Sequence, residues 1–320
     1  MNDTLLAIGE VLIDFIPNQT GCSFSEVSAF SPCLGGAPAN VCGAFSRLGG
    51  QAKLLSQVGD DPFGHKILDE LSACGVDISA VPLTKKANTA LAFVSLDANG
   101  DRTFSFYRNP SADMLFTPEQ IQESWFLQAY ALHFCSVSLG NTPMCQAHRC
   151  AVDFARKHDV IVSFDPNIRL SLWEHPAELQ AAVREFLPYA DILKLSDEEL
   201  AFVTGTDDIE RALPQLWKHG IRLVIYTCGS GGAYAYTPHI SVFSPAAKVS
   251  AVDTTGAGDG FIGAFLWKLQ QHAIGLSELS SVTDVVLQDC MDFSNAFCAV
   301  SVQAHGAISS YPTLDAMQNK

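Results

Sequence analysis

One stretch of the sequence, residues 249–264, places a carboxylate beside a glycine-rich turn and reads VSAVDTTGAGDGFIGA. Gly256, Ala257 and Gly258 carry little or no side chain, so their backbone N–H groups can approach a ligand closely. At the start of a helix, such N–H groups favour an anion. Asp259 follows directly. A carboxylate at this place is either a base that faces a phosphoryl group or a cap of the helix.

The residues around this turn predict the elements that position it. The apolar, β-branched run from Val249 to Val252 predicts a short buried strand. Phe261, Phe265 and Leu269 then recur four residues apart, which indicates one face of a helix. The turn would therefore join a strand directly to a helix.

Two further groups of residues could bind a polar ligand. The sequence GGAPANVCGAFSRLGG at 35–50 predicts a tight turn at Gly35 and Gly36 and a helix that ends at a second glycine pair. Asn40, near the start of that helix, is either a local cap or a ligand. Asp14 lies in an apolar run and is either a structural acid or an acceptor for the hydroxyls of a polyol.

Beyond residue 113, predicted strands and helices alternate, which is typical of an α/β fold with a doubly wound, mainly parallel sheet and helices on both faces. Ligands bind such folds at the carboxyl ends of the strands. Four polar segments are expected at that edge: Asp165–Arg169, Lys194–Glu199, Thr227–Gly229 and Gly256–Asp259. Their convergence predicts one composite site.

Residues 89–108 break this alternation. They read as two strands, ALAFVSLD and RTFSFYR, joined through Asn99-Gly100, which is a strong hairpin signal. Together with the edge-like strands of residues 16–33, they predict a small separate sheet. We expect one α/β domain over residues 1–320, with this sheet inserted from about 13–33 and 87–109. The sheet would serve as a lid over a site, as a dimer interface, or as both.

Composition excludes several classes of function. The 320 residues are 48% hydrophobic and carry a net charge of −15, which argues against nucleic acid and anionic membranes as partners. The chain has no uninterrupted apolar run of membrane-spanning length and no secretory signal, so we expect a cytoplasmic protein. Ten cysteines without a C-x-x-C pair fit free thiols. Cys145, His148 and Cys150 do not share a helix face, so a metal site is not expected there.

Other phosphate-binding motifs do not explain the sequence. Gly258, Gly260 and Gly263 formally match the G-x-G-x-x-G of dinucleotide-binding folds. The charge of Asp259 inside this motif would repel a pyrophosphate, and no strand ending in an acid follows at the usual distance. The chain contains no Gly-Lys dipeptide and therefore no P-loop, and it has no protein-kinase H-R-D loop.

Two long motifs, GGAPANVCGAFSRLGG at 35–50 and DTTGAGDGFIGA at 253–264, resemble the signatures of the ribokinase-like (PfkB) carbohydrate kinases. Shorter elements follow in the family's order and spacing: DPNIR at 165–169, KLSDEE at 194–199, TCGSGGA at 227–233, Asn295 and AHGA at 304–307. The resemblance covers essentially the whole chain. It implies a kinase that uses ATP and Mg²⁺, with a nucleotide groove and a sugar site under a β lid.

The resemblance also implies roles for individual residues. Asp259 matches the base that deprotonates the accepting hydroxyl, and Gly256, Ala257 and Gly258 match the anion hole. Ser196 stands where many members have Asn, before the acid that organises the magnesium-bound phosphates. The expected sugar contacts are Asp14, Gly35, Gly36, Asn40, Arg108, Asn167 and Arg169. The expected nucleotide contacts are Lys194, Glu199, Thr227, Gly229, Gly232 and Asn295. A monovalent-cation site, used with K⁺ in several members, matches Asp253, Thr255, Ser301, Ala304 and Gly306.

The identity of the sugar depends on few residues. Several segments resemble the fructokinase branch, in which Arg108 and Arg169 would approach the far side of a hexose. Similar arginines occur in 2-keto-3-deoxygluconate kinases, where they bind the substrate carboxylate. A surface charge is the alternative for Arg108. Fructose is favoured over the keto-acid, and aminoimidazole riboside and other nucleosides follow. A sugar sensor without activity and a structural dimer formed through the lid are the alternatives to an enzyme.

Overall fold

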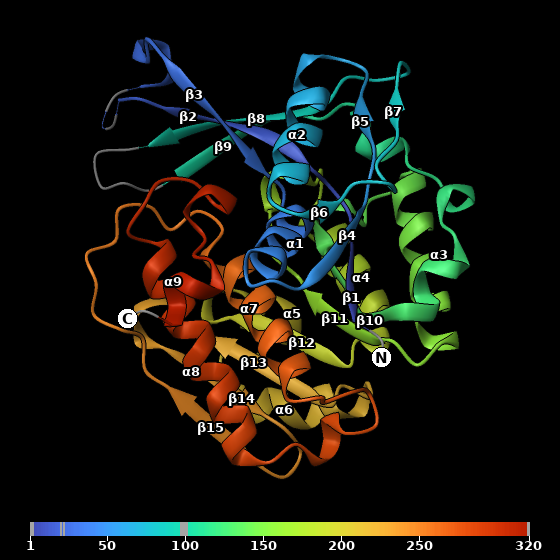
Figure 1. The fold of residues 1–320 in the computed structure, drawn as a ribbon, viewed down its shortest axis with the longest axis vertical. Helices are drawn as coiled ribbons and strands as arrows, with labels where there is room; N and C mark the ends of the chain where they lie inside the picture. Colours follow the sequence, from blue (N-terminus) through green and yellow to red (C-terminus); the bar gives the residue numbers. More distant parts are fainter. Residues whose placement is uncertain (1–2, 20, 22, 97–101, 319–320) are drawn as a thin grey trace.

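The centre of the molecule is a nine-stranded sheet (Figure 1). The computed structural model describes residues 3–19, 21, 23–96 and 102–318. The strands lie in the order β15-β14-β13-β12-β11-β10-β1-β4-β6; all run in the same direction except β14, which is antiparallel to both of its neighbours. Their bounds are β1 Thr4–Ile8, β4 Gln51–Leu55, β6 Val76–Asp77, β10 Ala129–Cys135, β11 Ile161–Asp165, β12 Ile192–Ser196, β13 Leu223–Thr227, β14 Ala233–Tyr236 and β15 Ser241–Ser244.

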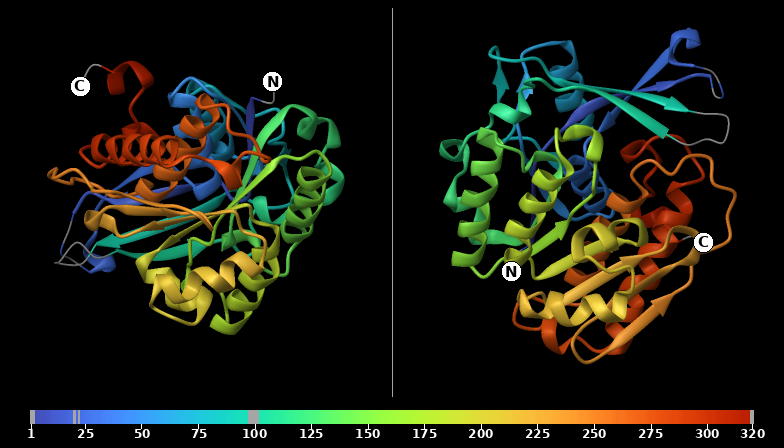
Figure 2. Two further views of the ribbon diagram at one scale, coloured as in Figure 1. Left: turned by 90° about the horizontal axis from the view of Figure 1, so that it is seen from below. Right: turned by 180° about the vertical axis from the view of Figure 1, so that it is seen from behind.

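Helices cover both faces of this sheet, as the left view of Figure 2 shows. Because both faces are covered, central strands such as β10 and β11 are buried along their whole length, which explains why most of their residues are apolar. One face packs against α1 (Ala37–Arg47), α2 (Pro62–Ala73), α7 (Ala257–Gln271), α8 (Asp284–Ser301) and α9 (Leu314–Gln318). The other packs against α3 (Pro143–Lys157), α4 (Pro176–Phe186), α5 (Asp197–Thr204) and α6 (Ile209–Lys218). The predicted fold class is confirmed.

A smaller sheet of four strands projects from the large one (Figure 1). Its order is β3-β2-β8-β9, with β2 Leu12–Pro17, β3 Phe30–Gly35, β8 Ala90–Leu96 and β9 Arg102–Tyr107. Side chains alternate between its two faces. Asp14 is opposite Cys33 and Ala92, whereas Phe15 stacks on Phe93 from the other face. A third, two-stranded sheet pairs β5 (Val58–Gly59) with β7 (Leu83–Thr84).

The sequence prediction of a hairpin is confirmed for its two strands, since β8 and β9 pair antiparallel from Leu91 and Tyr107 onward. The predicted turn at Asn99-Gly100 lies outside the described residues. In the part of the chain that is described, no helix combines the length and the apolar composition needed to cross a membrane.

The predicted strand from Val249 to Val252 is wrong. This segment has no strand partner, and Val249 and Val252 are 39% and 52% exposed. The backbone N–H groups of Val252 and Asp253 instead donate to the carbonyl of Val302, at 2.7 and 3.1 Å, just beyond α8. Because Val249 lines a cavity beside the glycine turn, the apolar run forms a wall of that cavity rather than part of the sheet core.

Candidate active site

The glycine turn at the start of α7 is held from behind by the C-terminal part of the chain. Gly256 is the N-cap of α7 with φ +70°, a conformation that favours glycine. A Cβ atom there would lie 2.5 Å from the Cβ of Ala307, so the site also excludes a side chain. Tyr311 Oη donates to the Gly256 carbonyl at 2.6 Å, and Cys298 Sγ lies 3.2 Å from the Ala257 carbonyl. These contacts fix the two carbonyls, and the N–H of Ala257 donates to the Thr254 carbonyl at 3.2 Å, so both sides of the turn are held.

Asp259 does not cap α7, because Gly256 occupies the N-cap position. Its Oδ2 accepts a hydrogen bond of 2.8 Å from Nδ2 of Asn40, which lies in the first turn of α1. Asn40 is only 4% exposed, and its Oδ1 has no partner among the described residues. A buried acceptor of this kind is expected to be satisfied by a ligand hydroxyl. The helix that starts at Ala37 and the glycine turn before α7 thus meet through this hydrogen bond.

Burial raises the pKa of Asp259 to about 6. The hydrogen bond from Asn40 and the charges of Lys194 and Arg169 oppose this shift, and the negative charge of Asp165 adds to it. A carboxylate with a pKa close to 6 is deprotonated at neutral pH and is still basic enough to accept a proton from a hydroxyl as it attacks. The site therefore contains a group suited to general-base catalysis.

A buried ion pair stands beside the turn. Lys194 Nζ, on β12, donates to Asp165 Oδ2 at 2.6 Å, and both side chains are at most 6% exposed. Burial lowers the pKa of Lys194, but the carboxylates of Asp165 and Glu199 outweigh it, so the pKa is raised and the ammonium stays charged. A Cβ atom on Gly258 would lie 3.3 Å from this ammonium. The charge of Lys194 therefore adds to the anion-binding character of the turn.

Asp165 was not among the predicted site residues, although its motif was. The signal that could have identified it is Lys194 itself, because a lysine inside a buried strand requires a carboxylate partner. Asn167 follows Asp165 with φ +46°, and its N–H donates to Asp165 Oδ1 at 3.2 Å. Arg169 is exposed. This loop thus arranges a carboxylate, an amide and a guanidinium around one opening.

Glu199 accepts two backbone hydrogen bonds, from Ser196 at 2.9 Å and from Ile168 at 2.7 Å. The first closes the capping box that starts α5, and the second ties the 165–169 loop to that helix. No cluster of three or more His, Cys, Asp or Glu side chains in the described residues could hold a metal by itself. This arrangement fits Mg²⁺ that is carried mainly by phosphate oxygens and water, with one or two protein carboxylates nearby.

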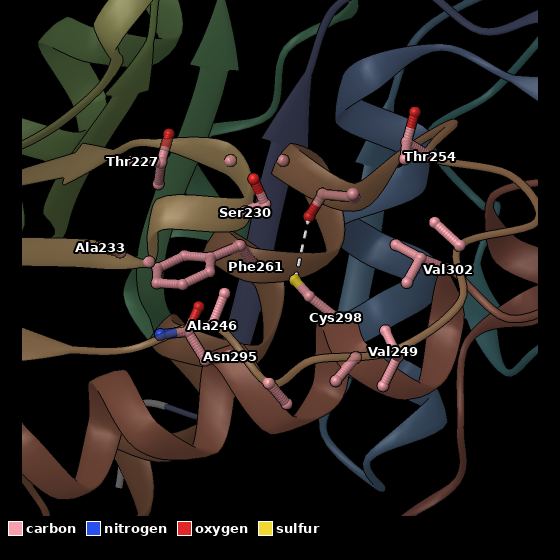
Figure 3. Close-up of a pocket in the computed structure, with 17 residues that line it drawn as sticks. Thr227, Ser230, Ala233, Ala246, Val249, Thr254, Phe261, Asn295, Cys298 and Val302 are labelled. Atoms are coloured by element: carbon pink, nitrogen blue, oxygen red, sulfur yellow. Dashed lines mark hydrogen bonds between the residues drawn. The ribbon is translucent and has the colours of Figure 1, made fainter. Parts of the chain in front are cut away.

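Three cavities are neighbours through shared lining residues, and Asp259 lines the one that shares residues with both of the others. This middle cavity has a volume of about 700 Å³ and is lined by Asp165, Asn167, Arg169, Lys194, Glu199, Gly258 and Asp259, among others. Thr227 and Gly258 also line the second cavity, of about 300 Å³, which Figure 3 shows. Phe104 joins the middle cavity to a third, of about 560 Å³.

The second cavity contains the residues expected to contact a nucleotide. Thr227, Gly229, Gly232 and Asn295 line it together with apolar groups from Phe261 and Val302 (Figure 3). The Nδ2 of Asn295 donates to the carbonyl and hydroxyl oxygens of Ser244, at 2.9 and 2.8 Å, so this amide orients the cavity wall. An apolar slot next to an anion-binding turn is suited to a base with attached phosphates.

The third cavity lies under the small sheet and contains Asp14, Asp253 and Thr255. A Cβ atom on Gly35 would lie 2.1 Å from Asp14 Oδ2, so the carboxylate rests directly on the Gly35-Gly36 turn. The predicted sugar-binding groups of β2 and the 35–36 turn are therefore adjacent.

Arg108, which was predicted to contact the sugar, lines none of these three cavities. It lines a fourth, of about 230 Å³, and its guanidinium is paired with Asp113, which is 1% exposed. Its guanidinium is thus held by a carboxylate of the protein, away from the cavity that contains Asp14. The sequence could not reveal the pairing of Arg108 with Asp113, because Asp113 lies five residues further on in a segment without a recognisable motif.

The predicted cation-binding residues lie together behind the anion turn. Asp253 is 6% exposed and accepts hydrogen bonds from the N–H and hydroxyl of Thr255, at 2.8 and 2.7 Å, and from the N–H of Gly306 at 2.9 Å. Ser301 ends α8 next to this group, and the N–H of Ala304 donates to its carbonyl at 3.2 Å. Whether these residues bind a cation stays a prediction.

The sequence is similar to that of plant sugar kinases. It is 41% identical to the probable fructokinase-2 of Arabidopsis thaliana over 311 residues, which cover 97% of this chain and 93% of that protein.

Two solved structures are similar along their whole length. The fructokinase of Xylella fastidiosa with bound ATP superposes with a TM-score of 0.90 at 33% identity, covering 100% of this chain and 98% of that one. A double mutant of the Vibrio cholerae O395 fructokinase, in its fructose-, ADP- and potassium-bound form, gives 0.87 at 32% identity over 99% and 98% of the two chains. The family model described as pfkB family carbohydrate kinase matches residues 2–314, and the chain therefore belongs to this family of carbohydrate kinases.

Proposed function

We propose that this carbohydrate kinase transfers the γ-phosphoryl group of ATP to a hydroxyl of fructose, with Asp259 as the general base. The observation that carries the proposal is the position of Asp259, between the anion-binding turn at Gly256–Gly258 and the buried amide of Asn40. The similar proteins named above are fructokinases, which supports fructose as the sugar.

The proposed mechanism assigns a separate task to each group. Asp259 accepts the proton of the attacking hydroxyl, and Asn40 keeps its carboxylate oriented towards that hydroxyl. The N–H of Gly258 and the ammonium of Lys194 would stabilise the negative charge that spreads over the transferred group, and the N–H of Ala257 would join them by exchanging its 3.2 Å bond to the Thr254 carbonyl for one to the phosphoryl oxygens. Phosphoryl transfer requires little covalent chemistry from the protein, so catalysis rests on this positioning and charge. Magnesium, bound to the phosphates near Glu199 and Asp165, would neutralise further charge.

The three neighbouring cavities support the proposed placement of the substrates. The adenosine part of ATP would occupy the apolar cavity at Thr227, Gly229, Gly232 and Asn295. The sugar would lie at Asp14 and the Gly35-Gly36 turn, beneath the small sheet, which would act as a lid that excludes water. K⁺ would bind at the Asp253 cluster, where it would support the turn from behind.

The charge around Arg108 favours a neutral sugar over a keto-acid. A carboxylated substrate needs a free guanidinium to form a bidentate pair. Arg108 is already paired with Asp113, and the charge of Glu10 also attracts it. Of the two arginines that could bind the carboxylate of 2-keto-3-deoxygluconate, Arg169 alone lines the cavity that contains Asp259. One arginine recognises an acid less strongly than two.

A coupled ADP-release assay tests the proposal. Purified protein with ATP and Mg²⁺, with and without K⁺, is offered fructose, 2-keto-3-deoxygluconate, ribose and aminoimidazole riboside. We expect fructose to give the highest kcat/KM. A higher kcat/KM for the keto-acid would overturn fructose but leave the kinase mechanism in place. Absence of turnover with every sugar, together with measurable sugar binding, would favour a sensor.

A further inference from the structure

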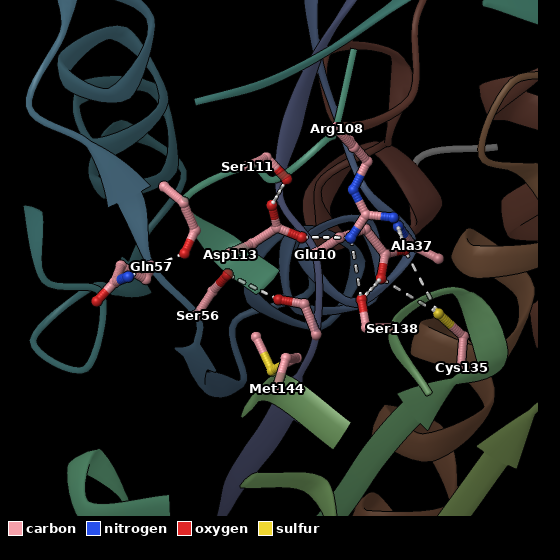
Figure 4. Close-up of polar contacts among 12 residues, drawn as sticks. Glu10, Ala37, Ser56, Gln57, Arg108, Ser111, Asp113, Cys135, Ser138 and Met144 are labelled. Carbon is pink, nitrogen blue, oxygen red and sulfur yellow. Dashed lines mark hydrogen bonds and ion pairs between the residues drawn. The ribbon is translucent and has the colours of Figure 1, made fainter. Parts of the chain in front are cut away.

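A buried cluster of charged side chains lies outside the three neighbouring cavities of the candidate active site (Figure 4). Its members are Glu10, Arg108 and Asp113. Glu10 and Asp113 are 2% and 1% exposed, and the side chain of Arg108 is 6% exposed. Arg108 Nε has no hydrogen-bond partner among the described residues, so the cluster is incompletely satisfied. A cluster whose only role was stability is expected to be fully satisfied, because apolar packing would otherwise be more favourable.

The cluster joins the small sheet to the large one. Arg108 directly follows β9 and pairs with Asp113, at the start of a short helical turn. Its Nη2 lies 3.4 Å from the hydroxyl of Ser138, just beyond β10. The same hydroxyl donates to Glu10 Oε2 at 2.9 Å, in the connection between β1 and β2. The end of β9 is thus fixed to the carboxyl edge of the large sheet.

The other side of Glu10 fixes the start of α1. Its Oε1 accepts a hydrogen bond of 3.2 Å from the N–H of Ala37, the first residue of that helix. Gly36 has φ +105°, and a Cβ atom there would lie 2.6 Å from the Glu10 carbonyl oxygen. Both the side chain and the backbone of Glu10 therefore define the 36–37 turn. Asn40, one helical turn further on, holds Asp259.

We propose that Glu10 and Arg108 are positioning residues for the sugar half of the active site. Through this cluster, the end of β9 and the start of α1 keep one relative placement, so that the 35–36 turn and Asn40 meet the sugar in a single geometry. The nucleotide half is built on β13, α7 and α8, and it shares no hydrogen bond with the cluster among the residues that the structure describes.

Sugar recognition should therefore depend on the cluster more strongly than ATP recognition does. This inference rests on the proposed phosphorylation of fructose. Turnover of fructose by the unaltered protein is measured first, and its absence would count against the proposed function and not against the cluster; the sugar that is turned over then replaces fructose in the comparison.

The test compares KM values for fructose and ATP in R108M, R108K and E10Q. We expect R108M to raise KM for fructose at least about fivefold while KM for ATP stays within about twofold. R108K, which keeps the charge, should recover part of the loss. E10Q should also raise KM for fructose, although Glu10 lines none of the three cavities. In the double variant E10Q/R108M, the increase in KM for fructose should be smaller than the product of the two single-variant increases, because both residues act through one cluster.

The matched control is R149M. It breaks the 2.7 Å ion pair between Arg149 on α3 and Glu185 on α4. It should leave both KM values unchanged. An unchanged fructose KM in E10Q would overturn the proposal, and so would an equal rise of both KM values in folded R108M. If R108M does not fold, R108K and E10Q decide the question by the same criterion. Full effect in R108M with wild-type behaviour of E10Q would instead indicate that Arg108 touches the sugar directly.

Discussion

At the scale of single residues, the proposed mechanism makes the reaction depend on the protonation state of Asp259. Its pKa of about 6 follows from burial, which the Asn40 hydrogen bond only partly offsets. A general base acts when it is deprotonated, so activity should be full above pH 7 and fall as pH decreases through about 6. Below that pH, kcat/KM should drop about tenfold per pH unit. A pH–rate profile with fructose checks this, and a profile that stays flat down to pH 5 would contradict it.

The same pKa has a consequence for stability. The folded-state pKa of Asp259 is raised from 3.8, so its charged form opposes folding. This contribution to stability is present below pH 4 and is lost as pH rises through about 6. Asp259→Asn should therefore raise the free energy of unfolding at pH 8, by at most about 3 kcal/mol, because solvent contact of the carboxylate reduces the effect. At pH 4 the substitution should have little effect. Urea unfolding at both pH values measures this; an equal gain at both would contradict it.

At the scale of elements, the N-terminus of α7 depends on a contact that the sequence does not suggest. Tyr311, 55 residues beyond Gly256, donates to the Gly256 carbonyl at 2.6 Å. Tyr311→Phe removes this hydrogen bond, while the carbonyl keeps the 2.7 Å bond from the N–H of Gly260, so the loss is that of one hydrogen bond, about 0.5 to 1.5 kcal/mol. We expect the turn to lose its fixed geometry, so that kcat decreases while KM for fructose changes little. Steady-state kinetics on the folded variant measures both.

A matched control exists in Tyr130, which is also buried and donates to the backbone carbonyl of Ile274 at 2.9 Å, in contact with none of the three cavities. Tyr130→Phe should reduce stability similarly but leave kcat unchanged. If both substitutions lower kcat to the same extent, the effect belongs to general stability and not to the anion turn.

The elements also show which predictions local sequence allows. The helix from Ala257 was predictable because its apolar residues recur with helical spacing. The strand at Val249–Val252 was predicted wrongly because a short apolar run does not reveal whether it is buried in a sheet or lines a cavity. Arg108 was predicted to contact the sugar from its motif alone. Its pairing with Asp113 could not be predicted, because that contact depends on the fold.

At the scale of the whole molecule, the parallel sheet explains why distant motifs meet. The carboxyl ends of β11, β12 and β13 bring Asp165, Lys194 and Thr227 to one edge, and α7 adds Asp259. This convergence was predictable from the alternation of strands and helices. The contacts of Glu10 and Tyr311 were not, because each joins segments with no periodic relation in the sequence.

We propose that two molecules associate through the outer face of the small sheet. Phe93 packs there against Phe15, Phe30 and Tyr107, and Tyr107 and Phe24 remain 62% and 45% exposed. Contiguous exposed aromatic surface of this kind is typical of interfaces. Light scattering should give a dimer mass.

Tyr107→Asp should shift this mass towards the monomer. The control substitution, Val285→Asp, changes an equally apolar residue that is 74% exposed on α8 and should leave the mass unaltered. A monomer mass for the unaltered protein would contradict the proposed association.

The central claim is that Asp259 is the base, and the most direct measurement is the kcat of Asp259→Asn with saturating fructose, ATP and Mg²⁺. The substitution keeps the size of the side chain and an oxygen that can accept the Asn40 hydrogen bond, but it removes the basic charge. The account predicts a decrease in kcat of at least about 10², with little change in fructose affinity. Turnover close to that of the unaltered protein would contradict it and would remove Asp259 from this role.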